Sequence, residues 1–449
     1  MHILLVYPTK LNKDGKPKKY KKAFFPPLSL AILNSITPSH HKVTVINDIV
    51  EEIDFSNSYD LVGITGMTAQ IERTYQVADR FRNLGTKVII GGIHATALPE
   101  EAKQHADAVV IGECDNIWEQ ILSDCENNNL KDFYKDTELP NLQDVAMPKW
   151  DNINLKIYPK PMGYKLPMMP IYTTRGCPYN CKFCTVTKFF GRTFREKPIA
   201  SVIKEIESVN AESYFFVDDN IAGNVSYSRD LFKALSKKKI RWGSQISTTI
   251  IKKPDLIELA AKAGCEHVFI GIESINNMTL KSINKGFNKT EEYSELFKRL
   301  RKAGIYPHAS IVFGFDNDTK EVFRETIDFL LKNKVGATFF LLTPYPGTTM
   351  REEMRDSGMI NEHKWSMYDA NHVVFQPKNF TVNELTESYW KTYQEWLSLK
   401  NISKKSLNSM AIAKNPLRRF IEQVFYEFYY RSVVNTYEHP FSGGVGRVM

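Results

Sequence analysis

Short hydrophobic runs recur along the first 125 residues, and the stretches between them carry apolar residues at helical spacing. The runs are typical of buried strands, and they cover residues 2–7, 43–48, 61–66, 87–92 and 108–113. Helices are expected to begin near Leu28 and Ile71. Strands that alternate with helices in this way predict an α/β domain with a doubly wound, Rossmann-like parallel sheet.

A second series of runs lies between residues 169 and 350 and repeats the same strand–helix unit. The expected strands cover residues 169–172, 214–217, 240–246, 267–273, 308–313 and 337–342, with helices near 198–209, 226–236, 254–263, 289–303 and 319–333. Two of these helices end in Lys-Ala-Gly, at 262–264 and 302–304, where glycine suits the end of a helix. Six such units predict a partial (β/α)6 barrel, whose functional loops lie at the C-terminal ends of its strands.

The two α/β regions are expected to form separate domains. We expect the first domain at 1–125, a linker at 126–168, the barrel at 169–350 and a further region at 351–449. The linker is polar and then contains scattered prolines, which favours an extended crossing segment. The last region is mostly helical in its spacing and has many aromatic residues, which is typical of a cover over a substrate site.

The composition narrows the class of protein. The 449 residues are 43% hydrophobic and 24% charged, as in an ordinary globular protein. There is no apolar run long enough for a transmembrane helix and no signal-peptide pattern, and the cysteine usage fits a reducing compartment, so we expect a cytoplasmic location. The net charge of +8 comes from scattered lysines rather than a basic face with stacking aromatics, so we expect no nucleic-acid partner.

The strongest chemical signal is a group of three cysteines on the loop after strand 169–172. Cys177, Cys181 and Cys184 follow the spacing C-x-x-x-C-x-x-C, with Phe183 directly before the last. Soft thiolates select iron–sulfur clusters, zinc or copper(I), and a structural zinc site needs four ligands. A four-iron cluster held by three cysteines keeps one iron open for a small molecule. A zinc loop with a distant fourth ligand, or free thiols, are the alternatives.

A three-cysteine loop of this spacing after a buried strand resembles the signature of the radical S-adenosylmethionine (radical SAM) enzymes. The resemblance implies a [4Fe–4S] cluster whose open iron chelates the amino and carboxylate groups of SAM, which the reduced cluster cleaves to a 5′-deoxyadenosyl radical. It also implies that polar residues at the barrel's C-terminal strand ends bind SAM. We expect this role for Asp218, Asp219, Gln245, Glu273 and Ser310. For the aspartates, a helix cap is the alternative.

The first domain resembles the cobalamin-binding domain that precedes many radical SAM domains. The likeness lies in residues 25–31, 91–100 and 112–118. The Asp-x-His-x-x-Gly motif, whose histidine ligates cobalt in mutases, is absent, so the cofactor is expected to bind without a protein histidine on the metal or to have been lost. The expected cobalamin-binding residues lie at or near C-terminal strand ends: Thr9, Thr65, Gly66, Gly91, Gly92, His94, Thr96, Gly112 and Glu113. For His94, a structural role is the alternative.

The two resemblances together imply a cobalamin-dependent radical SAM enzyme. The main hypothesis is a methyltransferase that acts on an unactivated carbon through a 5′-deoxyadenosyl radical and methylcobalamin. The alternatives are an anaerobic oxidative cyclase or other radical C–H chemistry and, from a different class, a non-catalytic iron–sulfur or cobalamin sensor. The expected partners are a small-molecule or lipid-like substrate and a reductant such as flavodoxin or ferredoxin. An amphipathic, aromatic-rich helix at 416–437 adds a hypothesis of peripheral membrane contact.

Overall fold

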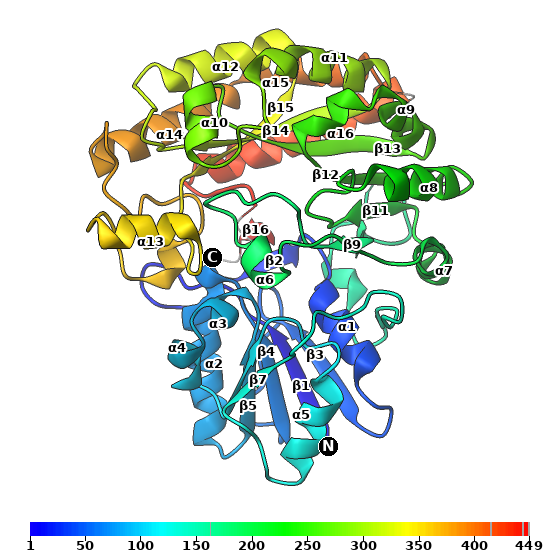
Figure 1. The fold of residues 1–449 in the computed structure, drawn as a ribbon, viewed down its shortest axis with the longest axis vertical. Coiled ribbons are helices and arrows are strands. Elements are labelled where there is room, and N and C mark those ends of the chain that lie inside the picture. The colour runs from blue at the N-terminus through cyan, green and yellow to red at the C-terminus, as the bar shows by residue number, and fades with distance from the viewer. Residues whose placement is uncertain (162, 414, 442–443, 448–449) are drawn as a thin grey trace.

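The computed structural model describes residues 1–449 except 162, 414, 442–443 and 448–449. Two parallel sheets of six strands each lie one above the other along the long axis of the molecule (Figure 1). Helices follow the strands in both halves, so the predicted α/β class is confirmed.

The first sheet has the strand order β3-β1-β4-β5-β6-β7. Its strands are β1 (His2–Tyr7), β3 (Lys42–Asn47), β4 (Leu61–Thr65), β5 (Lys87–Gly91), β6 (Ala108–Ile111) and β7 (Phe133–Lys135). Its helices are α1 (Leu28–Ile36), α2 (Ile71–Asn83), α3 (Ile93–Ala97), α4 (Pro99–Lys103) and α5 (Trp118–Glu126). Five strands were expected, and β7 adds a sixth from the segment predicted as the linker.

Both faces of this sheet are buried because successive side chains of a strand point to opposite faces. Ile3 and Leu5 of β1 belong to the core on the side of α1 and α5. Leu4 and Val6 belong to the core on the side of α2, α3 and α4. The continuous hydrophobic run of residues 2–7 therefore reports a sheet covered on both faces, as parallel sheets are.

The second sheet has the order β15-β14-β13-β12-β11-β8, and all six predicted strands are present. They are β8 (Met169–Ile171), β11 (Ser213–Phe216), β12 (Arg241–Ile246), β13 (Cys265–Glu273), β14 (Tyr306–Phe313) and β15 (Gly336–Leu341). The helices that follow them are α7 (Ile199–Val209), α8 (Val225–Leu235), α9 (Pro254–Lys262), α10 (Asn277–Ser282), α11 (Tyr293–Lys302) and α12 (Val322–Asn333). Gly264 and Gly304 take positive φ just past α9 and α11, as the Lys-Ala-Gly pattern predicts. Since β8 and β15 are its edge strands, the barrel is open.

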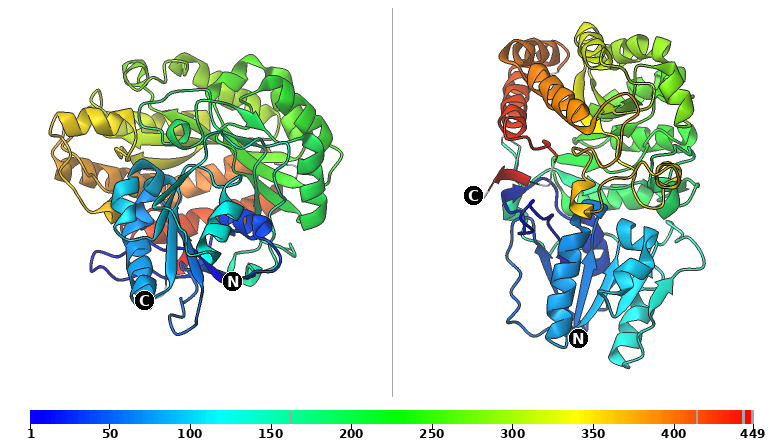
Figure 2. Two further views of the ribbon diagram at one scale, coloured as in Figure 1. Left: turned by 60° about the horizontal axis from the view of Figure 1, so that its bottom comes forward. Right: turned by 90° about the vertical axis from the view of Figure 1, so that its left-hand side faces the viewer.

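The last hundred residues form mostly helices, and the orange to red helices among them lie together on one side of the barrel (Figure 2). They are α13 (Thr349–Asp356), α14 (Val382–Trp396), α15 (Leu399–Met410) and α16 (Pro416–Val434). Beyond them, β16 (Gly444–Arg447) pairs with β2 (Tyr20–Ala23), so the end of the chain lies against the segment that follows β1. In the part of the chain that the structure describes, no helix combines the length and apolar character needed to span a bilayer.

Candidate functional site

The cysteine loop leaves the C-terminal end of β8 and lies between the two sheets, where Figure 1 shows its short helix α6 (Val186–Phe189). It is enclosed by two short antiparallel strands, β9 (Thr174–Arg175) and β10 (Arg195–Glu196). Gly176 begins the loop with φ +92°, and a side chain there would collide with the carbonyl oxygen of Thr193. The tight backbone approach explains the glycine directly before Cys177.

The sulfur atoms of Cys177, Cys181 and Cys184 are not gathered as closely as the ligands of a single zinc ion. Among the described residues, the three sulfur atoms are not grouped within 4.8 Å of one another. A tetrahedral zinc ion with Zn–S bonds near 2.3 Å would place its thiolates about 3.8 Å apart. Burial raises the pKa of all three thiols, that of Cys184 to about 12, so the thiolates require a strongly cationic group beside them. An iron–sulfur cluster is larger than one metal ion, and its iron atoms supply the positive charge that the thiolates require.

The two aspartates after β11 have different surroundings. Asp218 is almost fully buried and accepts hydrogen bonds from the backbone N–H and hydroxyl of Thr173 and from the hydroxyl of Thr174. It therefore fixes the segment that leads into the cysteine loop. Among the described residues none donates a hydrogen bond to Asp219, and burial together with the charge of Asp218 raises its pKa to about 7. Its charge reaches Cys177 and Cys184, so Asp219 is the carboxylate available to a cationic ligand beside the cysteines.

Gln245 and Ser310 lie at the same end of the barrel, on β12 and β14. The side chain of Gln245 is exposed although the strand around it is buried, and Ser310 is half-buried. In the described part of the chain neither side chain has a hydrogen-bond partner. Both side chains are therefore available to a ligand, and their role in binding SAM stays a prediction.

Glu273 ends β13 and forms a buried ion pair with Lys285, with 2.6 Å between Oε1 and Nζ. Its backbone has φ +62°, a conformation that a non-glycine residue adopts only when its surroundings hold it there. The Lys285 ammonium lies 5.8 Å from the centre of the Phe183 ring. Burial alone would lower the pKa of Lys285, but Glu273 and Cys181 together raise it. The ion pair thus places a positive charge beside the cysteine loop, and Lys285 carries no sequence signal that would have identified it.

Gly271 leaves the space that this ion pair occupies. A Cβ atom at Gly271 would lie 2.7 Å from both Glu273 Oε1 and Lys285 Nζ. We expect Gly271→Ala to displace the pair and to lower the free energy of unfolding by about 1–3 kcal/mol, the usual cost of overpacking. Chemical denaturation measures this, with Gly286→Ala as the control because its Cβ would make only ordinary contacts from 3.6 Å. Equal stability of the two variants would contradict the interpretation.

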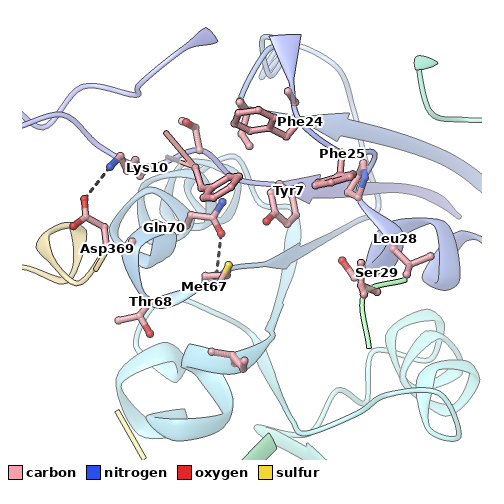
Figure 3. Close-up of a pocket in the computed structure, with 18 of the residues that line it drawn as sticks. Tyr7, Lys10, Phe24, Phe25, Leu28, Ser29, Met67, Thr68, Gln70 and Asp369 are labelled. Atoms are coloured by element: carbon pink, nitrogen blue, oxygen red, sulfur yellow. Dashed lines mark hydrogen bonds and ion pairs between the residues drawn. The ribbon is translucent and has the colours of Figure 1, made fainter. Parts of the chain in front are cut away.

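The carboxyl ends of the first sheet border a cavity of about 660 Å³ that also reaches the barrel. Its floor follows the strands of the first sheet, with Tyr7, Thr9 and Lys10 after β1 and residues 67–70 after β4. Its other walls come from the segment 23–29, the barrel and the end of the chain, and include Phe24, Phe25, Pro170, Val217, Tyr345, Tyr368 and Phe441. Figure 3 shows the aromatic rings of this cavity above Met67 and Gln70. The lining is mostly apolar and aromatic.

An ion pair closes one side of this cavity. Lys10 Nζ lies 2.9 Å from Asp369 Oδ2, and His372 Nδ1 lies 2.9 Å from Oδ1 of the same carboxylate (Figure 3 shows the first contact). Burial alone would raise the pKa of Asp369, but Lys10 and His372 hold that pKa well below its usual range. The pair joins the segment after β1 to the region beyond α13, so the cavity wall is built from segments far apart in sequence.

The cobalamin-binding residues predicted from the sequence lie around this cavity in different ways. Thr9 lines it directly, whereas Gly66 and Gly92 are explained by close packing of the loops on one another. A Cβ on Gly66 would lie 2.6 Å from the Thr74 hydroxyl, and one on Gly92, which has φ +99°, would lie 2.8 Å from the Thr65 hydroxyl. The loops nearest the cavity contribute Met67, Thr68, Ala69, Gln70 and Ile93 instead, one to four residues from the predicted positions.

His94 and Glu113 have protein partners of their own. His94 is fully buried, with Nε2 3.2 Å from Glu101 and its ring edge-on to Trp365 at 4.9 Å. Glu113 is bound by Arg175 and Arg195 at the base of the cysteine loop. Thr96 accepts a hydrogen bond from the backbone N–H of Gly112 at 2.9 Å. None of these side chains lines the cavity, so their positions favour support of the surrounding loops.

The fold and the site together define a class. An open parallel barrel with a three-cysteine loop, joined to a doubly wound sheet across a large cavity, is the arrangement of a radical enzyme that uses a second cofactor. Family models for the radical SAM superfamily and the B12 binding domain match residues 171–330 and 30–122.

Two relatives from Chlorobaculum tepidum extend the match to nearly the whole chain. The bacteriochlorophyllide d C-12(1)-methyltransferase is 32% identical over 417 residues, which are 90% of this chain and 90% of the relative. The bacteriochlorophyllide d C-8(2)-methyltransferase is 33% identical over 85% of this chain and 87% of its own length. Among solved structures, the cobalamin-dependent radical SAM enzyme OxsB with aqua-cobalamin and SAM bound has a TM-score of 0.69 at 14% identity, over 97% of this chain and 72% of that one.

The chain belongs to the cobalamin-dependent radical SAM enzymes. Its cofactors are a [4Fe–4S] cluster, SAM and cobalamin, as the sequence predicts.

Proposed function

We propose that this enzyme methylates an unactivated carbon of a flat, largely apolar small molecule. The observation that carries the proposal is the 660 Å³ cavity, which opens both to the first domain and to the barrel and is lined mainly by aromatic and aliphatic side chains. The two relatives act on a bacteriochlorophyllide, a planar ring system, and they match this chain over almost its whole length. Tetrapyrroles and other fused-ring compounds are therefore the substrate class that we propose.

The proposed cofactor sites follow from the geometry. Cys177, Cys181 and Cys184 are proposed to hold the cluster, since all three lie on the loop after β8 and burial raises the pKa of each thiol. We propose that Asp219 binds the SAM ammonium group, with Gln245, Ser310 and the Glu273–Lys285 pair around the remainder of SAM. The residues after β1, β4 and β5 that line the cavity floor, including Thr9, are proposed to contact cobalamin.

The proposed cofactor-binding residues and the cavity residues have different roles in the reaction. The bound cofactors supply a 5′-deoxyadenosyl radical and a transferable methyl group. The cavity residues, among them Phe24, Phe25 and Tyr345, would hold the substrate in one orientation, and their apolar side chains would exclude water from the site. Asp219 and Lys285 provide opposite charges for the two charged ends of the methionine part of SAM.

The products of SAM test the reaction type. Anaerobically reconstituted enzyme, given SAM, cobalamin, a strong reductant and bacteriochlorophyllide d as the planar probe, is expected to form both S-adenosylhomocysteine and 5′-deoxyadenosine. SAM with a trideuterated methyl group should label the probe or a related tetrapyrrole. 5′-Deoxyadenosine without S-adenosylhomocysteine would instead indicate oxidative cyclisation or other radical chemistry. Neither product, with both cofactors bound, would indicate a sensor.

Two partner hypotheses accompany this function. A flavodoxin or ferredoxin is proposed as the electron donor, because the cluster must be reduced before SAM is cleaved.

Peripheral membrane contact is proposed for α16, where Leu417, Ile421 and Phe425 recur every four residues and are 68%, 42% and 70% exposed. Such an apolar stripe suits the surface of a bilayer that carries an apolar substrate.

A further inference from the structure

Two like charges lie opposite each other at the base of the cysteine loop. In the antiparallel pair of β9 and β10, Arg175 is directly across from Arg195. Like charges in this position destabilise a pair of strands, and both arginine side chains are largely buried, with 9% and 15% exposed. The pairing therefore needs a negative charge between the two guanidinium groups.

Glu113 supplies that charge from the other domain. It follows β6 of the first sheet, and its two carboxylate oxygens reach both arginines, with Oε2 2.5 Å from Arg175 Nη1 and Oε1 2.5 Å from Arg195 Nη2. Asp115 adds a two-bond contact to Arg175, at 2.9 and 3.0 Å. With only 3% of the Glu113 side chain exposed, water cannot replace the carboxylate. The two arginines and the two carboxylates carry no net charge together, and their contacts join the first domain to the cysteine loop.

The same loop of the first domain also contacts the cavity wall. The backbone N–H of Gly112 donates to the hydroxyl of Thr96 in α3, and Ile93 at the start of α3 lines the cavity. Helix α3 also lies against α6 of the cysteine loop. A continuous set of contacts thus runs from the cavity floor through Gly112 and Glu113 to Arg175, two residues before Cys177.

We propose that Glu113 is a positioning residue that couples cobalamin binding in the cavity to the geometry of the cysteine loop. Cobalamin held against α3 orders the segment 112–115, and Glu113 then keeps the two arginines together and the cluster ligands in place. When the bridge is lost, repulsion between Arg175 and Arg195 opens the base of the loop. Because coupling between two sites is reciprocal, a bound cluster strengthens cobalamin binding by the same factor.

The rate at which the cluster loses iron tests this coupling without a turnover assay. Holoenzyme with its cluster is mixed anaerobically with a ferrous-iron chelator, with and without saturating hydroxocobalamin. We expect cobalamin to slow iron release about fivefold or more in the natural protein, the lower end of usual coupling, and to have no effect in Glu113→Gln. Equal slowing in the variant, or no slowing in the natural protein, overturns the proposal.

Glu205→Gln is the matched control. Glu205 is also a buried carboxylate near this loop, paired at 2.5 Å with Lys197 directly after β10, and among the described residues no hydrogen bond or ion pair joins it to the first domain. Its variant is expected to keep the cobalamin-dependent slowing. A measurement without any variant covers the case in which Glu113→Gln fails to fold: amide hydrogen exchange of residues 174–196 in the natural protein should fall when hydroxocobalamin is added. Unchanged exchange there contradicts the coupling.

Discussion

Cys181→Ala is expected to abolish cluster binding and, with it, the formation of 5′-deoxyadenosine. Cys181 is the middle ligand of the proposed trio, and its loss leaves two thiols on a partly exposed loop. Two thiolates cannot hold a four-iron cluster that already has an open corner, so iron content should fall to the level of the cluster-free protein. Iron analysis, the absorption spectrum of anaerobically purified protein and chromatography of the SAM products measure the effect.

Cys125→Ala is the control that shows whether the loss of the cluster is specific to Cys181 or follows from the removal of any cysteine. Cys125 is buried in α5 of the first domain, and its pKa is raised mainly by burial. That variant is expected to keep its iron and its 5′-deoxyadenosine production. If Cys181→Ala kept both as well, or if zinc rather than iron were found in the natural protein, the cluster assignment would be wrong.

The sequence predicts the framework of this enzyme well because the first sheet is covered on both faces and the strands of the second sheet are mostly buried. The runs at 2–7 and 61–66 are apolar at successive positions, as at Ile3–Val6, since each face of the strand meets a helix layer, and this pattern identifies them. The strands that escaped prediction are short and peripheral. β2 pairs with β16 near the other end of the chain, and β7 forms an edge of the first sheet with three residues.

Only part of the candidate site could be predicted from the sequence. The cysteines and the strand-end polar residues share a local pattern, so the sequence reveals them. The sequence does not reveal the partners of His94 and Glu113, because Trp365 and Arg175 contact them from distant segments of the chain. For the same reason no local feature marks Lys285 as the partner of Glu273. Residues whose surroundings depend on tertiary contact are the ones whose roles the sequence could not assign.

Asp218 and Asp219 show how far two identical neighbours can differ in function. Asp218→Asn removes the charge that accepts three hydrogen bonds from Thr173 and Thr174, so its loss should lower the free energy of unfolding by about 1–3 kcal/mol. Asp219 holds no such contacts in the described structure. Its substitution should therefore leave folding intact and change ligand binding instead.

Asp219→Asn is expected to weaken SAM binding about 10- to 150-fold, because a hydrogen bond to a charged group contributes about 1.5–3 kcal/mol. Equilibrium dialysis of SAM with the cluster-loaded enzyme measures this.

Asp219→Asn should also change how the free energy of unfolding depends on pH. The folded pKa of Asp219 is raised from 3.8 to about 7, so the folded state binds a proton that the unfolded state lacks between these values. Stability of the natural protein therefore falls as pH rises from about 4 to 7, and Asp219→Asn should remove that part of the slope. Unchanged SAM affinity in this variant would assign the ammonium group of SAM to another residue.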